Sequence, residues 1–341
     1  MSESPVHLVQ LIESGNRYVA MAVEPELYLL DRFDSVAALA QQAIEKQLSL
    51  SDLVRGNVST KHLNYEDVYS LRSSWKLLPS ADMPDNPRKV LVSGTGLTHL
   101  GSARDRQAMH LAAAKAEEAP MTDSMRMFEL GRQFGRPADG QIGVAPEWFY
   151  KGDGSVLRAT SAPLVVPGHG EDGGEEAEIA AVYMIGPDGT PHRIGMTNGN
   201  EFSDHVFERR NYLNLAGSKL RMCSIGPELV IGAEFDDIPG KVRILRDGTT
   251  HWEKKIQTGE RNMCHSLANL EHHLFKFEGH RQPGLMHVHF MGADTLSFGE
   301  GIRLKRGDET EVAFKGFGRP LRNVIDTEPQ LTEHVEVRLM Q

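Results

Sequence analysis

The sequence predicts an α+β protein whose core is rich in β-strands and is built as a sandwich or a barrel. Beyond about residue 135, glycines and prolines interrupt the chain every 8–15 residues, and short runs of aliphatic and β-branched residues lie between them. Few segments show the spacing of apolar residues that is typical of helices. Many short strands with few helices favour a β-rich core over a doubly wound parallel sheet.

The start of the chain predicts a small N-terminal α/β domain. Apolar spacing predicts two strands and then a helix that Ser35 caps, at residues 6–11, 18–23 and 35–45. A stretch rich in proline and aspartate, Pro79–Pro87, then predicts a linker. We therefore expect the domain boundary near residue 85, with one domain over residues 1–85 and a larger one over residues 86–341.

The larger region begins with a strand at residues 89–93 that leads into a glycine-rich loop. Three helices are expected, at residues 104–118, 121–134 and 265–277, because their apolar residues recur at helical spacing. Turn signals separate the predicted strands, which lie at residues 164–166, 179–185, 192–197, 229–232, 242–246, 287–291 and 311–314.

Composition excludes several classes of protein. Hydrophobic residues make up 40% of the 341 positions and charged residues 25%, which is typical of a folded soluble protein. The formal charge of −10 argues against a nucleic acid or an anionic membrane surface as partner. Cys223 and Cys264 are too few for a disulfide framework. The chain lacks an apolar run of about 18 residues and a start like a signal peptide, so we expect a cytoplasmic location.

The most informative residues are acidic. Glu176 and Glu178 stand two apart at the start of a predicted strand, so their side chains point to one face. Adjacent carboxylates repel unless a cation lies between them. Mg²⁺ prefers such oxygen ligands. Glu201 and Lys219 follow and complete a candidate site, although acidic runs on their own are usually solvated loops.

Two other motifs are weaker evidence for a binding site. The loop with Gly94, Gly96 and Gly101 resembles a dinucleotide-binding fingerprint, but His99 stands where that pattern needs its third glycine. His287 and His289 share a strand face as zinc ligands often do, yet no third ligand has convincing spacing. A tight loop and structural histidines are the better interpretations.

Read in order, several segments resemble motifs of the fumarylacetoacetate hydrolase superfamily. They are Pro146–Lys151, Glu176–Glu178, Gly195–Asp204, Gly217–Lys219, Ser224–Pro227, Arg306–Asp308, Val312–Gly318 and Leu321–Asn323. The resemblance covers roughly residues 88–325. Within the superfamily the chain is most similar to the GguC group, found with genes of sugar-acid catabolism, and to the 2-keto-3-deoxyarabinonate dehydratases. Residues 92–101 and 146–151 carry this closer likeness.

The resemblance implies a fold, a metal and a set of residues. The fold would be a mixed β-sandwich roll preceded by a small N-terminal domain. Glu176 and Glu178 match the first two Mg²⁺ ligands, with Mn²⁺ or Ca²⁺ as possible substitutes, and Glu201 stands where the third ligand is usually Asp. Lys219 matches the active-site lysine and Glu147 an active-site glutamate. Substrate contacts are expected from Ser93, Thr98, Lys151, Gly292 and Ala293.

One departure from the family indicates the type of reaction. Hydrolases of the superfamily carry a histidine, partnered by a glutamate that activates water, where this chain has Ser102, and His99 falls three places earlier. The resemblance therefore implies a Mg²⁺-dependent dehydratase of a 2-keto-3-deoxy sugar acid that forms 2,5-dioxopentanoate in pentose catabolism, as a homodimer. Lys219 or Glu147 would be the base. The alternatives are a hydrolase or tautomerase of a 2,4-diketo acid and a non-enzymatic sugar-acid binding protein.

Overall fold

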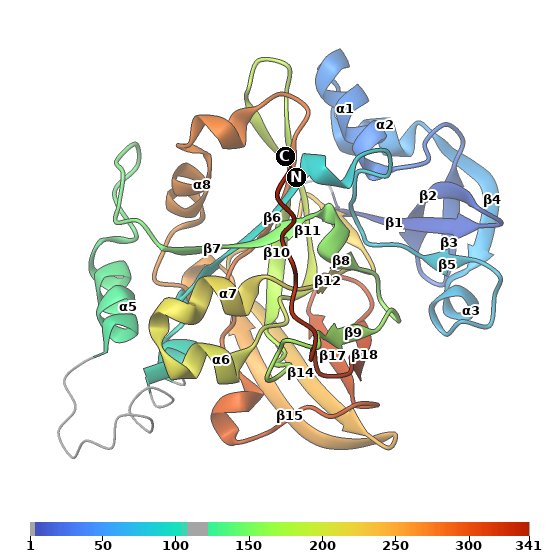
Figure 1. Ribbon diagram of the computed structural model, residues 1–341. Helices are drawn as coiled ribbons and strands as arrows, with labels where there is room; N and C mark the ends of the chain where they lie inside the picture. The colour runs from blue at the N-terminus through green and yellow to red at the C-terminus, as the bar shows by residue number, and fades with distance from the viewer. Residues whose placement is uncertain (1–3, 105, 108–121, 341) are drawn as a thin grey trace.

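The computed structural model describes residues 4–104, 106, 107 and 122–340 (Figure 1). The described strands form two sheets. The larger sheet has 13 strands, ordered β4-β3-β2-β1-β13-β11-β10-β16-β6-β7, with β5, β8 and β12 paired beside this path. The smaller has five, ordered β15-β14-β17-β18-β9. The mixed, strand-rich architecture confirms the predicted α+β fold.

The strands of the larger sheet are β1 (Val6–Glu13), β2 (Asn16–Val23), β3 (Glu26–Leu30), β4 (Val58–Asn64), β5 (Lys76–Leu77), β6 (Val90–Gly96), β7 (Glu147–Asp153), β8 (Leu157–Arg158), β10 (Ala177–Ile185), β11 (Pro191–Asn200), β12 (Cys223–Ile225), β13 (Leu229–Ile231) and β16 (Met286–Phe290). Those of the smaller sheet are β9 (Leu164–Val166), β14 (Ile238–Arg246), β15 (Thr249–Thr258), β17 (Glu309–Phe314) and β18 (Leu321–Thr327).

Helices cover the two sides of the body. In Figure 1, α1 to α3 lie on the side of β1–β5, and α5 and α8 lie on the opposite side. The labelled helices are α1 (Val36–Lys46), α2 (Leu50–Arg55), α3 (Tyr65–Tyr69), α5 (Asp123–Phe134), α6 (His205–Arg210), α7 (Leu215–Lys219) and α8 (Leu267–Phe275). Residues 100–104, 106 and 107 are helical as well.

Strand β10 is the centre of the larger sheet, and every one of its residues is buried. It pairs antiparallel with β11 on one side and with β16 on the other. Ala180 and Val182 belong to the apolar core that α1 covers, whereas Ile179 and Ala181 belong to the core that the smaller sheet and α8 cover. A strand that is held on both faces and both edges is a rigid base for the residues at its start.

The N-terminal strands continue the same sheet. Strand β1 pairs antiparallel with β13, with Leu8 opposite Leu229. The first 85 residues therefore share backbone hydrogen bonds with the larger region. Pairing between residues more than 200 positions apart leaves no local signal in the sequence.

Most predicted elements are present. Ser35 caps α1 by accepting a hydrogen bond from the N–H of Ala38, and the predicted strands and the helices α5 and α8 are confirmed. The helix predicted at 104–118 lies mostly outside the described residues. Several strands were missed, among them β3, β4, β7 and β18, and β15, much of whose surface is exposed and charged. Among the described residues, no helix has both the length and the apolar character needed to cross a membrane.

Candidate active site

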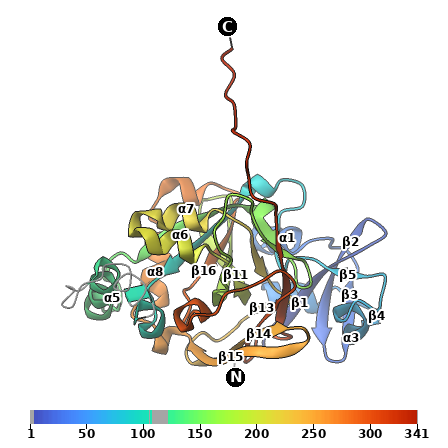
Figure 2. The same ribbon diagram turned by 60° about the horizontal axis from the view of Figure 1, so that its bottom comes forward.

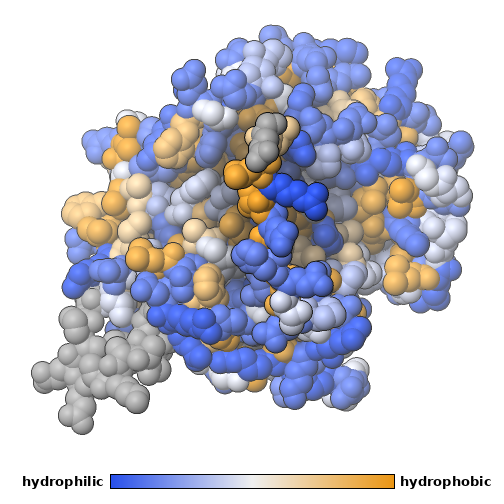
Figure 3. Space-filling model, in the orientation of Figure 1, coloured by the Kyte–Doolittle hydropathy of each residue, from blue (hydrophilic) through white to orange (hydrophobic). Residues whose placement is uncertain are grey.

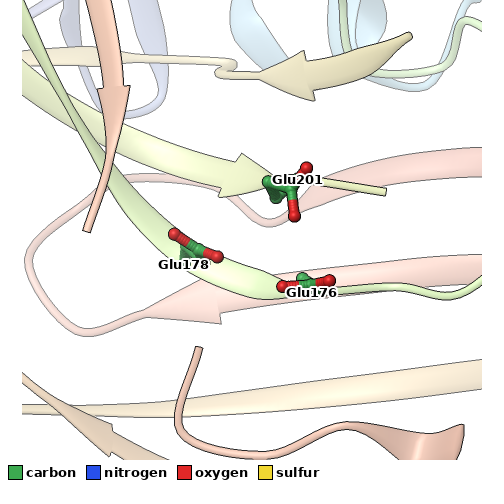
Figure 4. Close-up of side chains that lie close together, drawn as sticks. All are labelled: Glu176, Glu178 and Glu201. Atoms are coloured by element: carbon green, nitrogen blue, oxygen red, sulfur yellow. The ribbon is translucent and has the colours of Figure 1, made fainter. Parts of the chain in front are cut away.

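The three predicted glutamates meet at the start of β10. Glu176 precedes this strand, Glu178 is its second residue, and Glu201 directly follows β11. The N–H of Glu201 donates to the carbonyl of Glu176 at 3.0 Å, which holds the two chain segments together. One carboxylate oxygen from each side chain lies within 4.8 Å of the others, and all three residues are buried. Figure 4 shows the three side chains gathered between the two strands.

Two buried lysines neutralise part of this charge. Nζ of Lys219, at the end of α7, lies 2.5 Å from Oε1 of Glu176 and also contacts Oε2 of Glu201. Nζ of Lys151 lies 2.5 Å from Oε1 of Glu201. Both lysine side chains are fully buried. Each lysine contacts Glu176 or Glu201, and neither forms an ion pair with Glu178.

The pKa shifts differ among the three carboxylates. Burial and the charges of Glu176 and Glu201 hold the pKa of Glu178 well above its usual range, and burial and the charge of Glu176 raise that of Glu201. Burial also acts on Glu176, but Lys219, His205 and Arg106 together outweigh it and hold its pKa well below its usual range. Glu176 and Glu201 overcome the effect of burial on Lys219 and raise its pKa, so Lys219 is an ammonium group. A cation beside Glu178 would stabilise its charged form.

The donor set fits a hard divalent cation. Among the described residues, no basic side chain forms an ion pair with Glu178, and the N–H of Gly292 donates to its Oε2 at 2.6 Å. A cluster of buried carboxylate oxygens suits Mg²⁺, which takes oxygen ligands and is often held by few carboxylates. Mn²⁺ is chemically similar in this respect.

Strand β7 directs three buried side chains to one face. Glu147, Phe149 and Lys151 are buried, whereas the alternating Trp148 and Tyr150 are 40% and 37% exposed, as the two-residue period of a strand requires. The ring of Phe149 lies 4.6 Å from Nζ of Lys219. One strand face thus supplies a carboxylate, an aromatic platform and an ammonium group.

Glu147 is bound by two donors. Arg106 donates to its Oε1 at 2.7 Å, and the hydroxyl of Tyr212 donates to its Oε2 at 2.9 Å. Arg106 also contacts Glu208. These donors fix the position of both carboxyl oxygens of Glu147.

The residues predicted to bind substrate have different surroundings. Lys151 is buried against Glu201 and is not a surface lysine. Ser93 contacts Nδ1 of His289, and Thr98 donates to the carbonyl of Met291. Gly292 contacts Glu178 through its N–H. Ala293 lies in a small apolar cluster that includes Leu296 and Phe298. Their part in substrate binding stays a prediction.

The sequence interpretation missed several residues at this site. Nε2 of His205 lies 3.0 Å from Oε1 of Glu176, and the hydroxyl of Ser203 donates to Oε2 of Glu201. Ser203 lies within the Gly195–Asp204 motif and His205 directly follows it, so this motif was the available signal. Arg106 and Tyr212, which bind Glu147, lie in no recognised motif.

The competing readings of the histidines find no support in the structure. In the part of the chain that it describes, the acidic triad is the only cluster that could hold a metal ion, and burial lowers the pKa of His289 to about 3.

Ser102 donates to the carbonyl of His99, whose ring contacts Thr98 and Thr258. No hydrogen bond or ion pair of the described residues joins His99 or Ser102 to a carboxylate side chain.

The fold is that of the fumarylacetoacetate hydrolases, as comparison with solved structures shows. No family model matches the sequence, and no curated protein matches it. A structure of 2-keto-3-deoxyarabinonate dehydratase superposes with a TM-score of 0.70 at 17% identity, covering 95% of this chain and 99% of that one. A 2-keto-3-deoxy-D-arabinonate dehydratase complexed with magnesium and 2,5-dioxopentanoate gives 0.69 at 16% identity, with 95% and 99% covered. Fumarylacetoacetate hydrolase from Exiguobacterium antarcticum gives 0.58 at 16% identity, with 95% and 100% covered.

Proposed function

We propose that this protein is a Mg²⁺-dependent dehydratase that converts a 2-keto-3-deoxypentonate into 2,5-dioxopentanoate. The observation that carries the proposal is the buried triad of Glu176, Glu178 and Glu201 with Lys219 bound to two of its members. The similarity to a dehydratase complexed with magnesium and 2,5-dioxopentanoate supports it. The pathway would be non-phosphorylative pentose catabolism, in the cytoplasm.

The triad would hold the metal ion. When bound there, Mg²⁺ supplies Lewis-acid stabilisation of the negative charge that develops on the 2-keto oxygen as a C3 proton leaves. Lys151 would help to neutralise the substrate carboxylate, since its ammonium group already lies beside Glu201. Burial of these groups strengthens each electrostatic contact.

The contacts of Glu147 and Lys219 suggest which residue is base and which is acid. Arg106 and Tyr212 hold both carboxyl oxygens of Glu147 in place, so Glu147 is positioned to accept the C3 proton. Lys219 is an ammonium group that can donate a proton to the C4 hydroxyl as it leaves as water. A proton then moves from C5 to C3 to form an enol, and the C5 hydroxyl proton moves to C4, which gives the aldehyde. The overall change is the loss of one water and of no carbon.

The surroundings of Ser102 and His99 favour elimination over hydrolysis. Water-mediated carbon–carbon cleavage needs a base that activates water. His99 is engaged by Thr98 and Thr258, and burial lowers its pKa to about 4. In the described structure, His99 has no carboxylate side chain as a partner that would increase its basicity.

A substrate screen tests the proposal. Purified protein is incubated with Mg²⁺ and a series of 2-keto-3-deoxy acids, and products are identified by mass and by carbonyl derivatisation. We expect a dicarbonyl acid that has lost one water, and no product after treatment with EDTA. Pyruvate or another short acid would identify a hydrolase, and binding without turnover would identify a binding protein. Activity that EDTA leaves unchanged would exclude the metal site.

A further inference from the structure

The chain leaves the body of the protein after β18. The N–H of Glu328 donates to the carbonyl of Val166, and the N–H of Leu331 donates to that of Gly168, so the chain follows β9 this far. Residues 332–340, called here the C-terminal arm, form no hydrogen bond or ion pair with any other described residue. Figure 2 shows the arm extending away from the body as a nearly straight segment.

The arm has the residue pattern of a strand with one apolar side. Val335, Val337 and Leu339 are 75%, 88% and 88% exposed, and they alternate with the polar residues Glu336 and Arg338. Alternate residues of a strand point to opposite sides. In Figure 3, hydrophobic and hydrophilic residues lie close together where the arm crosses the front of the molecule. Unpaired backbone groups together with an exposed apolar side call for a partner strand.

We propose that this arm pairs antiparallel with the same arm of a second copy of the chain, with Val337 on the two-fold axis. The sequence of the arm is complementary to itself in this register. Glu336 lies opposite Arg338 of the second copy, and Arg338 opposite its Glu336. Val335 lies opposite Leu339, and Val337 opposite Val337. Opposite charges and apolar pairs that face each other across two strands stabilise a sheet, and a two-fold axis makes both contacts twice.

The other simple registers lack this complementarity. Parallel pairing in register sets Glu336 against Glu336 and Arg338 against Arg338, and like charges directly opposite are destabilising. Moving the two-fold axis to Glu336 places that carboxylate against its own copy and brings His334 opposite Arg338. The charge pattern therefore selects antiparallel pairing about Val337.

Pairing about Val337 places the two protein bodies at opposite ends of the paired arms, because each arm extends away from its own body after residue 331. In the antiparallel pair the apolar residues of both arms lie on one face of a two-stranded ribbon. Such a ribbon is marginally stable alone, so we expect association to depend on the protein concentration. This inference concerns association and does not depend on the proposed reaction.

Disulfide trapping tests the register. Cys223 and Cys264 are buried, so a cysteine placed in the arm is the accessible one. Val337→Cys faces itself across the axis, at a separation that suits a disulfide. Val335→Cys is the matched control. It faces Leu339 of the second copy, and the cysteine at position 335 of that copy lies four residue steps away. After mild oxidation we expect covalent dimer from Val337→Cys at about tenfold the rate of Val335→Cys. The double variant Val335→Cys/Leu339→Cys should cross-link readily as well.

Charge exchange tests whether the partner is the same arm. In the Val337→Cys background, Arg338→Glu sets Glu336 against a glutamate and should slow cross-linking several-fold. Adding Glu336→Arg exchanges the two charges and should restore the rate. Equal or absent cross-linking at positions 335 and 337 would overturn the proposed register. Failure of the double exchange to restore the rate would overturn pairing with a second copy. Circular dichroism should be unchanged in all variants, because the arm makes no hydrogen bond or ion pair with the described body.

Discussion

The backbone N–H of Gly292 donates a 2.6 Å hydrogen bond to Oε2 of Glu178. The carbonyl of the same peptide unit, on Met291, accepts a 2.9 Å hydrogen bond from the hydroxyl of Thr98. Thr98 therefore fixes the direction in which the N–H of Gly292 points. Position 292 must be glycine, since its φ is +96° and a Cβ there would lie 2.0 Å from the Thr98 hydroxyl.

Thr98 is accordingly expected to act on the metal site without touching it. Thr98→Val keeps the size of the side chain and removes the donor to Met291, so Glu178 loses a fixed partner. We expect metal affinity to fall by about 10–100-fold, as is typical when a residue behind a ligand is changed, and Thr98→Ser to keep most of it. Calorimetry with Mn²⁺ measures the affinity.

Thr95→Val is the matched control for this variant. Thr95 is equally buried on β6 and contacts a histidine, Nε2 of His289, without any bond to the triad. Its metal affinity should equal that of the unchanged protein. Equal losses of metal affinity in Thr95→Val and Thr98→Val would show that Thr98 acts only through packing.

Replacement of Glu178 by glutamine is predicted to separate stability from metal binding. Because the folded state raises the pKa of Glu178, its charge destabilises the metal-free protein at neutral pH. Glu178→Gln removes the charge, so we expect the melting temperature of the metal-free variant to be higher by at least about 1 °C. Mg²⁺ should raise the melting temperature of the unchanged protein and leave that of the variant unaltered. A variant that Mg²⁺ still stabilises would show that Glu178 is not a ligand.

Lys219→Met is expected to abolish turnover while metal still binds. The variant loses the proton donor, for which a loss of about 10²-fold or more in kcat is typical. It also removes an ammonium group that lies between Glu176 and Glu201, so the affinity for Mn²⁺ should rise or stay the same. The two quantities are measured separately, by product formation and by calorimetry. Loss of metal binding would mean that Lys219 organises the triad and does not merely compete with the ion.

The sequence predicted which glutamates gather at this site better than the residues that support them. Glu176 and Glu178 are two residues apart, so the strand period alone places them together, and Glu201 was found through the ordered series of motifs. Arg106 and Tyr212 reach Glu147 from positions 41 and 65 residues away. Such contacts depend on how helices pack over β7, which no local pattern in the sequence encodes.

The same limit applies to the fold. Apolar spacing predicted β10 and the helix capped by Ser35. Every residue of β10 is buried, and the helix buries one apolar side. It missed β15, whose outward side is polar, and it could not show that β1 pairs with β13. Periodicity indicates which side of an element is buried, whereas pairing is decided by the neighbours that cover that side.

Stability is predicted to fall between pH 6.5 and pH 4 in part through His289. Burial lowers the pKa of His289 to about 3, against about 6.5 in an unfolded chain. Between these values the unfolded chain binds a proton that the folded protein does not, so acidification favours unfolding by up to about 1.4 kcal/mol per pH unit. Urea denaturation at pH 7, 6 and 5 measures this slope. His289→Gln should lower stability at pH 7, since Ser93 and Thr95 lose their partner, yet show a shallower slope. An unchanged slope would contradict the assignment.

Gly96→Ala is predicted to impair the reaction through Glu147 alone. A Cβ at position 96 would lie 1.9 Å from Oε1 of Glu147, so the carboxylate would have to leave its place beside Arg106. Since a displacement of about 1 Å can cost about 10²-fold in rate, we expect kcat to fall by about that factor while Mn²⁺ affinity stays unchanged. Gly279→Ala is the control, because a Cβ there meets no atom within 4 Å, and it should retain full activity. Undiminished kcat in Gly96→Ala would show that Glu147 is not the base, and lost metal binding would show that the change spreads to the triad.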